Sequence, residues 1–127
     1  MAFVLTHEIQ RLASVYGIEK LGFLTLTFAD HITDIRRAQK RFHSLNTGAL
    51  SGRYRKLIGV WERQGNRRIH FHLVVVLQDD IRTGFDFAAV ESHDYRSACP
   101  ALRREWAWLR RTAKAYRFGR TELLPVK

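Results

Sequence analysis

The segment from Arg67 to Leu77 constrains the fold more than any other part of the chain, because its apolar content indicates a buried strand that also holds two histidines. Residues two apart in a strand point to the same face of a sheet. His70 and His72 are therefore expected on one face, and the apolar residues around them on the other. These apolar residues are Ile69, Phe71, Leu73 and Val75.

The two histidines have the spacing of metal ligands on a rigid strand. Neutral imidazole is the commonest metal ligand in proteins, and two ligands from one strand leave room for a carboxylate, water and a substrate oxygen. The same pattern also occurs where two polar residues occupy a half-exposed face of a sheet. The pair alone leaves both interpretations open.

The residues before this strand supply a third donor. Leu57 to Arg63 indicate a strand, and the turn composition that follows predicts an antiparallel hairpin. A loop of about three or five residues places Glu62 directly opposite His70 and on the same face as His72. A loop of about two residues would place Glu62 opposite Ile69 and break the site. With the odd loop, two nitrogens and an oxygen form a donor set suited to Mg²⁺ or Mn²⁺.

The charge balance indicates a polyanionic partner. The chain has 22 Lys and Arg against 12 Asp and Glu, a net charge of +10, which favours nucleic acid. Basic proteins can also be drawn to acidic membranes, but no apolar run approaches the length of a membrane span and the N-terminus does not resemble a signal peptide. A chain of 127 residues is expected to form one domain, residues 1–127. Cys99 is the only cysteine, which fits a reducing cytoplasm.

The rest of the pattern predicts helices packed on an antiparallel sheet, an α+β fold. A helix is expected from Phe3 to Gly17, and a strand from Leu21 to Phe28 with Thr25 and Thr27 on its polar face. Thr33 is expected to cap the second helix. The apolar side of the first helix comprises Val4, Ile9, Leu12 and Val15 or Tyr16.

The last part of the chain predicts a long helix and a short strand. Ser97 and Pro100 mark the start of the helix, Gly119 is expected to end it, and residues 120–126 form the strand. The apolar stripe of this helix recurs at steps of three and four residues and includes Tyr116.

Cations gather on the helix after Thr33 and in the segment from Thr47 to Lys56, whose glycines suit a mobile loop that grips a nucleic-acid backbone. The helix cations either contact phosphate or form the solvated side of the helix, and the segment may equally be an ordinary connection. The residues predicted to contact nucleic acid are Thr25, Thr27, Arg36, Arg37, Lys40, Arg41, Arg53, Arg55, Lys56, Arg67 and Arg68.

Four segments resemble the HUH family of rolling-circle replication initiators. Phe23 to Phe28 resembles the first motif of that family, and Ile69 to Val75 resembles the second. Asp80 to Asp86 and Phe118 to Val126 are similar to segments of the replication-associated proteins of filamentous bacteriophages and related plasmids. The resemblance runs from about Leu21 to Lys127.

The resemblance implies a ferredoxin-like fold that binds single-stranded or origin DNA in a bacterial host cell. In that family a histidine pair and an acidic residue hold a divalent metal that polarises the scissile phosphate, and a tyrosine attacks to form a 5′-phosphotyrosyl enzyme. By position, His70 and His72 match the motif histidines, and Glu62 matches the acidic ligand.

The sequence departs from the family at the nucleophile. The family has a Tyr-x-x-Lys type motif after the segment that resembles Phe118 to Val126, and the sequence to Lys127 contains no such motif. Tyr116 is the one replacement to test, although its place on the apolar stripe predicts that its ring packs inward. We therefore expect this chain not to capture DNA covalently.

Two classes of function stay open. The first is a DNA-nicking domain whose tyrosine helix is absent from this chain. The second is a non-catalytic protein of a mobile element that binds nucleic acid or inhibits a host nucleoprotein complex, as anti-CRISPR proteins do. A reading frame that continues into Tyr-x-x-Lys would favour the first class, and a stop codon would favour the second.

Overall fold

The structure, a computed structural model, describes the backbone of residues 2–127 and the side chains of residues 6–127, so the side chain of Val4 lies outside the described residues. The helices are α1 (Ala2–Tyr16), α2 (Ile35–Leu45), α3 (Ser51–Arg53), α4 (Phe87–Glu91) and α5 (Pro100–Ala115), with a 3-10 turn η1 (Ile18–Lys20) and a π turn η2 (Asn46–Leu50). The strands are β1 (Leu21–Phe28), β2 (Leu57–Arg63), β3 (Ile69–Val76) and β4 (Phe118–Pro125).

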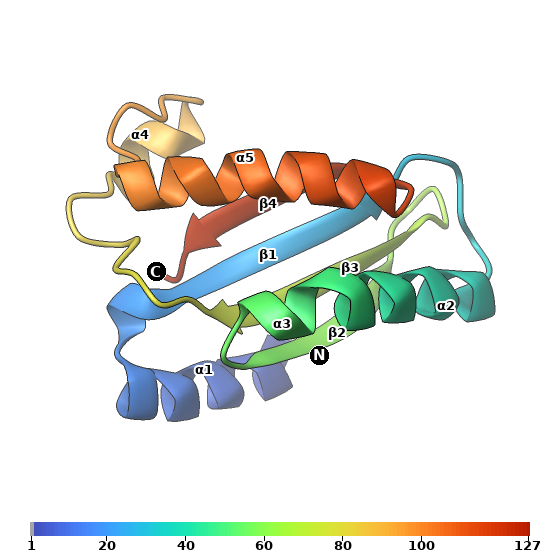
Figure 1. Cartoon of the computed structure of the whole chain (residues 1–127), viewed down its shortest axis with the longest axis horizontal. Helices are drawn as coiled ribbons and strands as arrows, with labels where there is room; N and C mark the ends of the chain where they lie inside the picture. The colour runs from blue at the N-terminus through green and yellow to red at the C-terminus, as the bar shows by residue number, and fades with distance from the viewer. Residues whose placement is uncertain (1) are drawn as a thin grey trace.

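The strands form one antiparallel sheet in the order β2-β3-β1-β4. Helical connections join β1 to β2 and β3 to β4, while β2 and β3 form a hairpin. This is the β-α-β-β-α-β arrangement of ferredoxin-like folds, and it confirms the α+β prediction. Figure 1 shows α5 and the continuous run of α2 and α3 side by side over one side of the sheet.

The side of the sheet under α2 and α5, here called the closed face, is filled by the apolar core. Strand β3 contributes the four residues predicted from its alternation, all of which are buried. Phe71 stacks on Phe42 of α2 with ring centroids 4.6 Å apart. Burial of side chains of this size stabilises the fold by about 2 kcal/mol each.

The other side of the sheet is divided into two parts. Over one part, α1 buries Leu12 against Leu21, Val74 and Val76. The other part, here called the open half, is polar. It consists of Thr25, Thr27, Glu62, His70 and His72, which alternate with core residues along β1, β2 and β3.

Two predicted helix boundaries were wrong by one to four residues. Helix α2 is capped by Asp34, whose carboxylate accepts a hydrogen bond from the backbone N–H of Arg36 at 3.0 Å, rather than by Thr33. Helix α5 ends before Gly119, which belongs to β4. Arg117 makes the left-handed turn instead, with φ 65°, so β4 starts at Phe118.

The segment predicted as a mobile loop, Thr47 to Lys56, is largely helical. The π turn η2 continues α2, and α3 follows without a break. Gly48 lets this run approach α5, because a Cβ at that position would lie 2.0 Å from the hydroxyl oxygen of Tyr116. Gly48 therefore serves the packing of this segment on α5.

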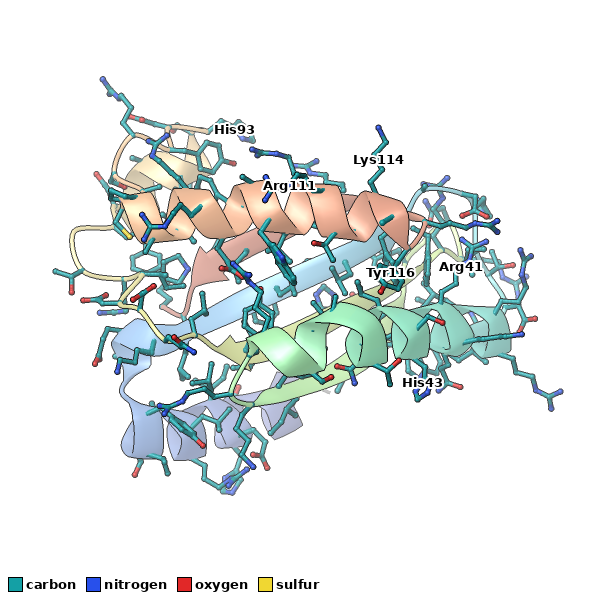
Figure 2. The ribbon with its side chains drawn as sticks, in the orientation of Figure 1. Arg41, His43, His93, Arg111, Lys114 and Tyr116 are labelled. Atoms are coloured by element: carbon teal, nitrogen blue, oxygen red, sulfur yellow. The ribbon has the colours of Figure 1, made fainter. Side chains whose placement is uncertain are left out.

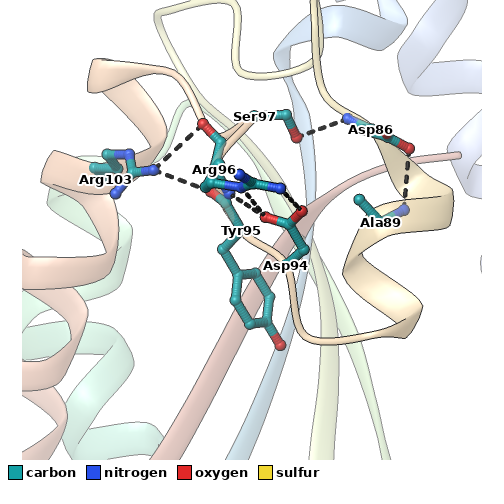
Figure 3. A network of polar contacts seen from close by, with 7 residues as sticks. All are labelled: Asp86, Ala89, Asp94, Tyr95, Arg96, Ser97 and Arg103. Atoms are coloured by element: carbon teal, nitrogen blue, oxygen red, sulfur yellow. Dashed lines mark hydrogen bonds and ion pairs between the residues drawn. The ribbon is translucent and has the colours of Figure 1, made fainter.

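A polar network fixes the connection from α4 to α5. Asp94 accepts hydrogen bonds from the guanidinium of Arg96, and Arg103 donates to the carbonyl oxygen of Tyr95 (Figure 3). Asp86 caps α4 by accepting from the backbone N–H of Ala89. The short helix α4 was not predicted.

Candidate metal and nucleic-acid site

The β2–β3 hairpin sets the geometry of the open half. The backbone N–H of Gln64 donates to the carbonyl of Arg68 at 2.9 Å, and that of Arg67 donates to Gln64 at 2.8 Å. Arg67, with φ 68°, is the left-handed residue that closes a loop of about three residues. The odd loop is confirmed, and Glu62 lies opposite His70 as predicted.

The side chain of His72 is held from several directions. Its Nε2 lies 3.5 Å from Oε1 of Glu62, its Nδ1 lies 3.3 Å from the hydroxyl oxygen of Thr25, and its ring stacks on Phe23 at 5.7 Å between centroids. His72 is opposite Val60 in the ladder, so its contact with Glu62 is diagonal. The imidazole is thus oriented toward a carboxylate on an otherwise accessible surface.

His70, directly opposite Glu62, lines a pocket of about 280 Å³ at the end of the sheet nearest the hairpin loop. Burial lowers the pKa of His70 below its usual 6.5, the nearby His72 lowers it further, and the carboxylate of Glu62 opposes the shift. The pKa shift favours the neutral imidazole, which is the form that binds metals.

The donor set is chemically suited to a divalent metal, although its side chains are not gathered around one point. Among the described residues, no three His, Cys, Asp or Glu side chains are arranged to hold a metal ion. Oε1 of Glu62 and Nε2 of His72 already lie 3.5 Å apart. His70 has the correct register and face, and a rotamer change would be required for it to join them.

Four of the predicted nucleic-acid contacts lie around the histidines. Thr25 is the cross-strand partner of His72, and Thr27 is the partner of His70. Arg68 lines the pocket beside His70, and Arg67 is exposed in the hairpin loop. These residues give the open half hydroxyl and guanidinium donors beside the candidate metal ligands.

Two predicted cations are engaged in ion pairs within the protein. Arg41 binds both carboxylate oxygens of Asp30. Arg53 binds both carboxylate oxygens of the buried Glu105, at 2.7 and 2.9 Å. Asp30 lines the pocket beside His70, so Arg41 reaches the edge of the open half, whereas Glu105 belongs to α5 on the closed face.

Arg55 and Lys56 lie at the opposite end of the sheet from the hairpin loop. Their backbone groups bond to Val76, the last residue of β3, and the guanidinium of Arg55 lies 5.9 Å from the ring of Tyr16. The predicted set of contacts is therefore distributed over three parts of the molecule.

Sequence reasoning missed several residues near the histidines. Arg120 of β4 lines the pocket beside His70, together with the amide side chains of Gln64 and Asn66. Arg120 also accepts, through its carbonyl oxygen, a hydrogen bond from the hydroxyl of Thr27 at 2.8 Å. The turn composition identified the hairpin, but only the sheet order brings β4 beside β1.

Two of the four tyrosines of the chain, Tyr54 and Tyr116, belong to the closed-face side of the sheet. The hydroxyl of Tyr54 donates to Glu105 at 2.6 Å, and burial and this carboxylate raise its pKa well above the ordinary value. Tyr116 lies between the C-terminal end of α5 and α2 (Figure 2), where it packs against the closed-face core. Its ring packs inward, as predicted. Tyr16, on α1, packs against the apolar cluster that this helix covers. The ring of Tyr95 meets that of Trp106 on α5 edge-on, with centroids 5.7 Å apart.

Comparison with known proteins connects the chain to a replicon protein. The chain is 53% identical over 126 residues to the phasyl DNA replicon protein arp of Escherichia coli. The match covers 99% of this chain and 44% of the relative, so the chain spans less than half of that protein's length. No protein-family model and no solved structure matches the chain. Over the described residues, no helix is both long and apolar enough to cross a membrane.

Proposed function

We propose that this chain is an HUH-type, single-strand DNA-binding domain with a replication-related role, and that its open half binds Mg²⁺ or Mn²⁺ together with a DNA phosphate. Glu62, His70 and His72 would be the protein ligands. A divalent cation bound there would supply Lewis-acid polarisation of a phosphate oxygen. The protein itself would position the strand.

The observation that carries this proposal is the placement of Glu62 against the histidine pair. The hairpin register puts the three residues on one face, with His72 and Glu62 already 3.5 Å apart. The face is accessible because α1 covers only the part of the sheet that lies toward Leu21 and Val76. A polar, accessible sheet surface with two imidazoles and a carboxylate has no role in the core.

The basic residues around this surface support a nucleic-acid ligand. Arg67, Arg68 and Arg120 lie at the end of the sheet nearest His70. Guanidinium groups bind phosphate with directed hydrogen bonds and release counterions when they do so. The named relative is a DNA replicon protein, which supports a role in replication for this chain.

The site residues present here favour DNA binding over covalent capture. In the resembling family a tyrosine attacks the polarised phosphate, yet Tyr54 and Tyr116 contact helices on the closed face. An oriented nucleophile can contribute an effective concentration on the order of 10⁵ M or more, which water at the same site lacks. Incubation with single-stranded DNA and Mn²⁺ should therefore yield no protein–DNA adduct by denaturing mass spectrometry.

The test of the proposal is the affinity for a fluorescent single strand, measured by anisotropy with Mn²⁺ and again with EDTA. We expect Mn²⁺ to tighten binding by the full-length chain, and His72→Ala to remove that enhancement. Arg68→Ala should weaken binding in both conditions and flatten the salt dependence by about 0.7 on logarithmic axes.

His93→Ala is the matched control, because His93 is exposed in the connection after α4 and labelled far from the sheet in Figure 2. It should keep the Mn²⁺ enhancement. Equal enhancement in His72→Ala and His93→Ala would reject the metal assignment, and the absence of DNA binding at low salt would reject the DNA assignment.

A further inference from the structure

We infer that the helix layer carries a second nucleic-acid site, in which a groove between α5 and the η2–α3 segment binds a phosphodiester backbone. This site lies on the closed-face side of the sheet, whereas the candidate metal ligands lie on the open half. The inference goes beyond the proposed function, because it involves other residues and requires no metal.

The groove has a volume of about 840 Å³. One bank is formed by η2 and α3, where a Cβ at Gly52 would meet no atom within 4 Å, whereas Gly48 is packed against Tyr116. The other bank is formed by α5, through residues that include Trp108, Arg111 and Thr112. Exposed glycine backbone allows a ligand backbone to approach closely.

The cations on the α5 bank are not used within the protein. Arg111 lines the groove, and Arg104 lies on the same helix outside the lining. Both are exposed, and among the described residues neither side chain has a hydrogen bond or ion pair. They are seven residues apart, two helical turns, and therefore lie on the same side of α5 at a separation of about 10.5 Å.

Helix α2, which leads into the η2–α3 bank, adds further positive charge outside the groove lining. Figure 1 shows α2 continuing into α3 alongside α5, and α2 carries the exposed cations Arg36, Arg37 and Lys40. These three side chains also have no ion pair among the described residues. Arg41, in contrast, is held by Asp30 and contributes little to the outward field.

The main acidic group of the groove is neutralised. Glu105 is buried and accepts hydrogen bonds from Arg53 and from the hydroxyl of Tyr54. The guanidinium of Arg53 also lies 4.0 Å from the ring centroid of Trp108. Asp79, at one end of the groove, is the remaining carboxylate in its lining. The lining thus presents Arg111 and part of Arg53 to a ligand, and its remaining acidic side chain is Asp79.

A phosphodiester backbone is the ligand that matches these features. It needs distributed positive charge and hydrogen-bond donors, and it tolerates a groove with little apolar lining. A peptide or an apolar cofactor would instead require a deeper apolar floor. Single-stranded and duplex DNA share this backbone chemistry, so the experiment must separate them.

The experiment uses the full chain with His70→Ala and His72→Ala as background, in EDTA, so that the metal face is disabled. Affinity for a short single strand and for a short duplex is measured by anisotropy over a range of salt concentrations. Added Arg104→Ser and Arg111→Ser should weaken binding and flatten the salt slope by about 1.4 if the ligand is single-stranded, or about 1.8 if it is duplex.

Lys20→Ser with Lys127→Ser is the matched control, because it removes the same charge from residues that are neither in the groove lining nor on α5, the helix that carries Arg104 and Arg111. It should leave the slope unchanged. Circular dichroism and thermal melting should be the same in both double variants, since the four side chains are outside the core. If the two double variants have equal affinities and slopes, the groove is not a nucleic-acid site, whatever the outcome of the metal test.

Discussion

The two sides of the sheet use alternate residues of the same strands for different purposes. On the closed face, Phe71 and Leu73 of β3 are buried under helices α2 and α5. On the other side, His70 and His72 of the same strand stay partly exposed, because α1 covers only the neighbouring part of that side. A single strand therefore supplies both stability and the candidate site.

This comparison teaches that the position within the alternation, more than the position along the chain, decides the effect of a substitution. Residues one apart on β3 differ in face, and residues two apart share it. The closed face should control the free energy of unfolding. The open half should control ligand binding with little effect on that free energy.

The largest expected effect tests this directly with neighbouring residues. Phe71→Ala removes a buried ring that stacks on Phe42, and should lower the free energy of unfolding by about 3 to 5 kcal/mol. His72→Ala, one residue away, should cost about 1 kcal/mol or less, because it removes only partly exposed contacts. Urea denaturation measures both. Similar losses in the two variants would break the comparison between faces.

A smaller effect is expected where a polar group lies on the closed side. Glu105→Ala leaves the buried hydroxyl of Tyr54 without its acceptor and Arg53 without its partner. We expect a loss of about 2 kcal/mol, less than for a fully buried ion pair because the side chain of Arg53 is 36% exposed. Arg104→Ala, on the exposed side of the same helix, should change stability by about 0.5 kcal/mol at most. An unchanged free energy of unfolding in Glu105→Ala would show that this cluster does not stabilise the packing of α3 on α5.

The smallest effect concerns pH. The pKa of His70 is lower in the folded chain than its usual 6.5, mainly through burial and also through His72. Below that usual value the unfolded chain binds the extra proton first, so His70 should reduce stability as the pH falls through 6.5 toward its folded pKa. His70→Gln should flatten this part of the stability–pH curve, measured by urea denaturation from neutral to mildly acidic pH. A parallel curve in parent and variant would contradict the shift.

Much of the sheet could be predicted because local patterns determine it. The alternation in β1 and β3 identified the faces, and the turn residues around Gly65 predicted the hairpin. The sequence left the loop length open, and the structure has the odd loop that places Glu62 opposite His70. The ends of the helices were harder to predict from the sequence. Thr33 and Asp34 are both good caps in adjacent positions, and Arg117 takes a left-handed conformation that the sequence would assign to Gly119.

The interactions that link distant segments could not be predicted from local patterns. Arg41 and Arg53 resemble free phosphate-binding cations in the sequence, but tertiary packing gives each a carboxylate partner, Asp30 and Glu105. The diagonal contact between His72 and Glu62 also depends on side-chain rotamers, which strand register does not specify. The helical path through Gly48 depends on its contact with Tyr116.

The most direct test of the central claim is an NMR titration of the histidine side chains with Mn²⁺, whose unpaired electrons broaden signals from nearby nuclei. The imidazole signals of His70 and His72 should disappear at substoichiometric Mn²⁺, while those of the exposed His43 and His93 remain. In Glu62→Gln, the same loss should require at least about tenfold more Mn²⁺. Uniform broadening of the signals from these four histidines, or unchanged signals from His70 and His72, would contradict a metal site on the open half.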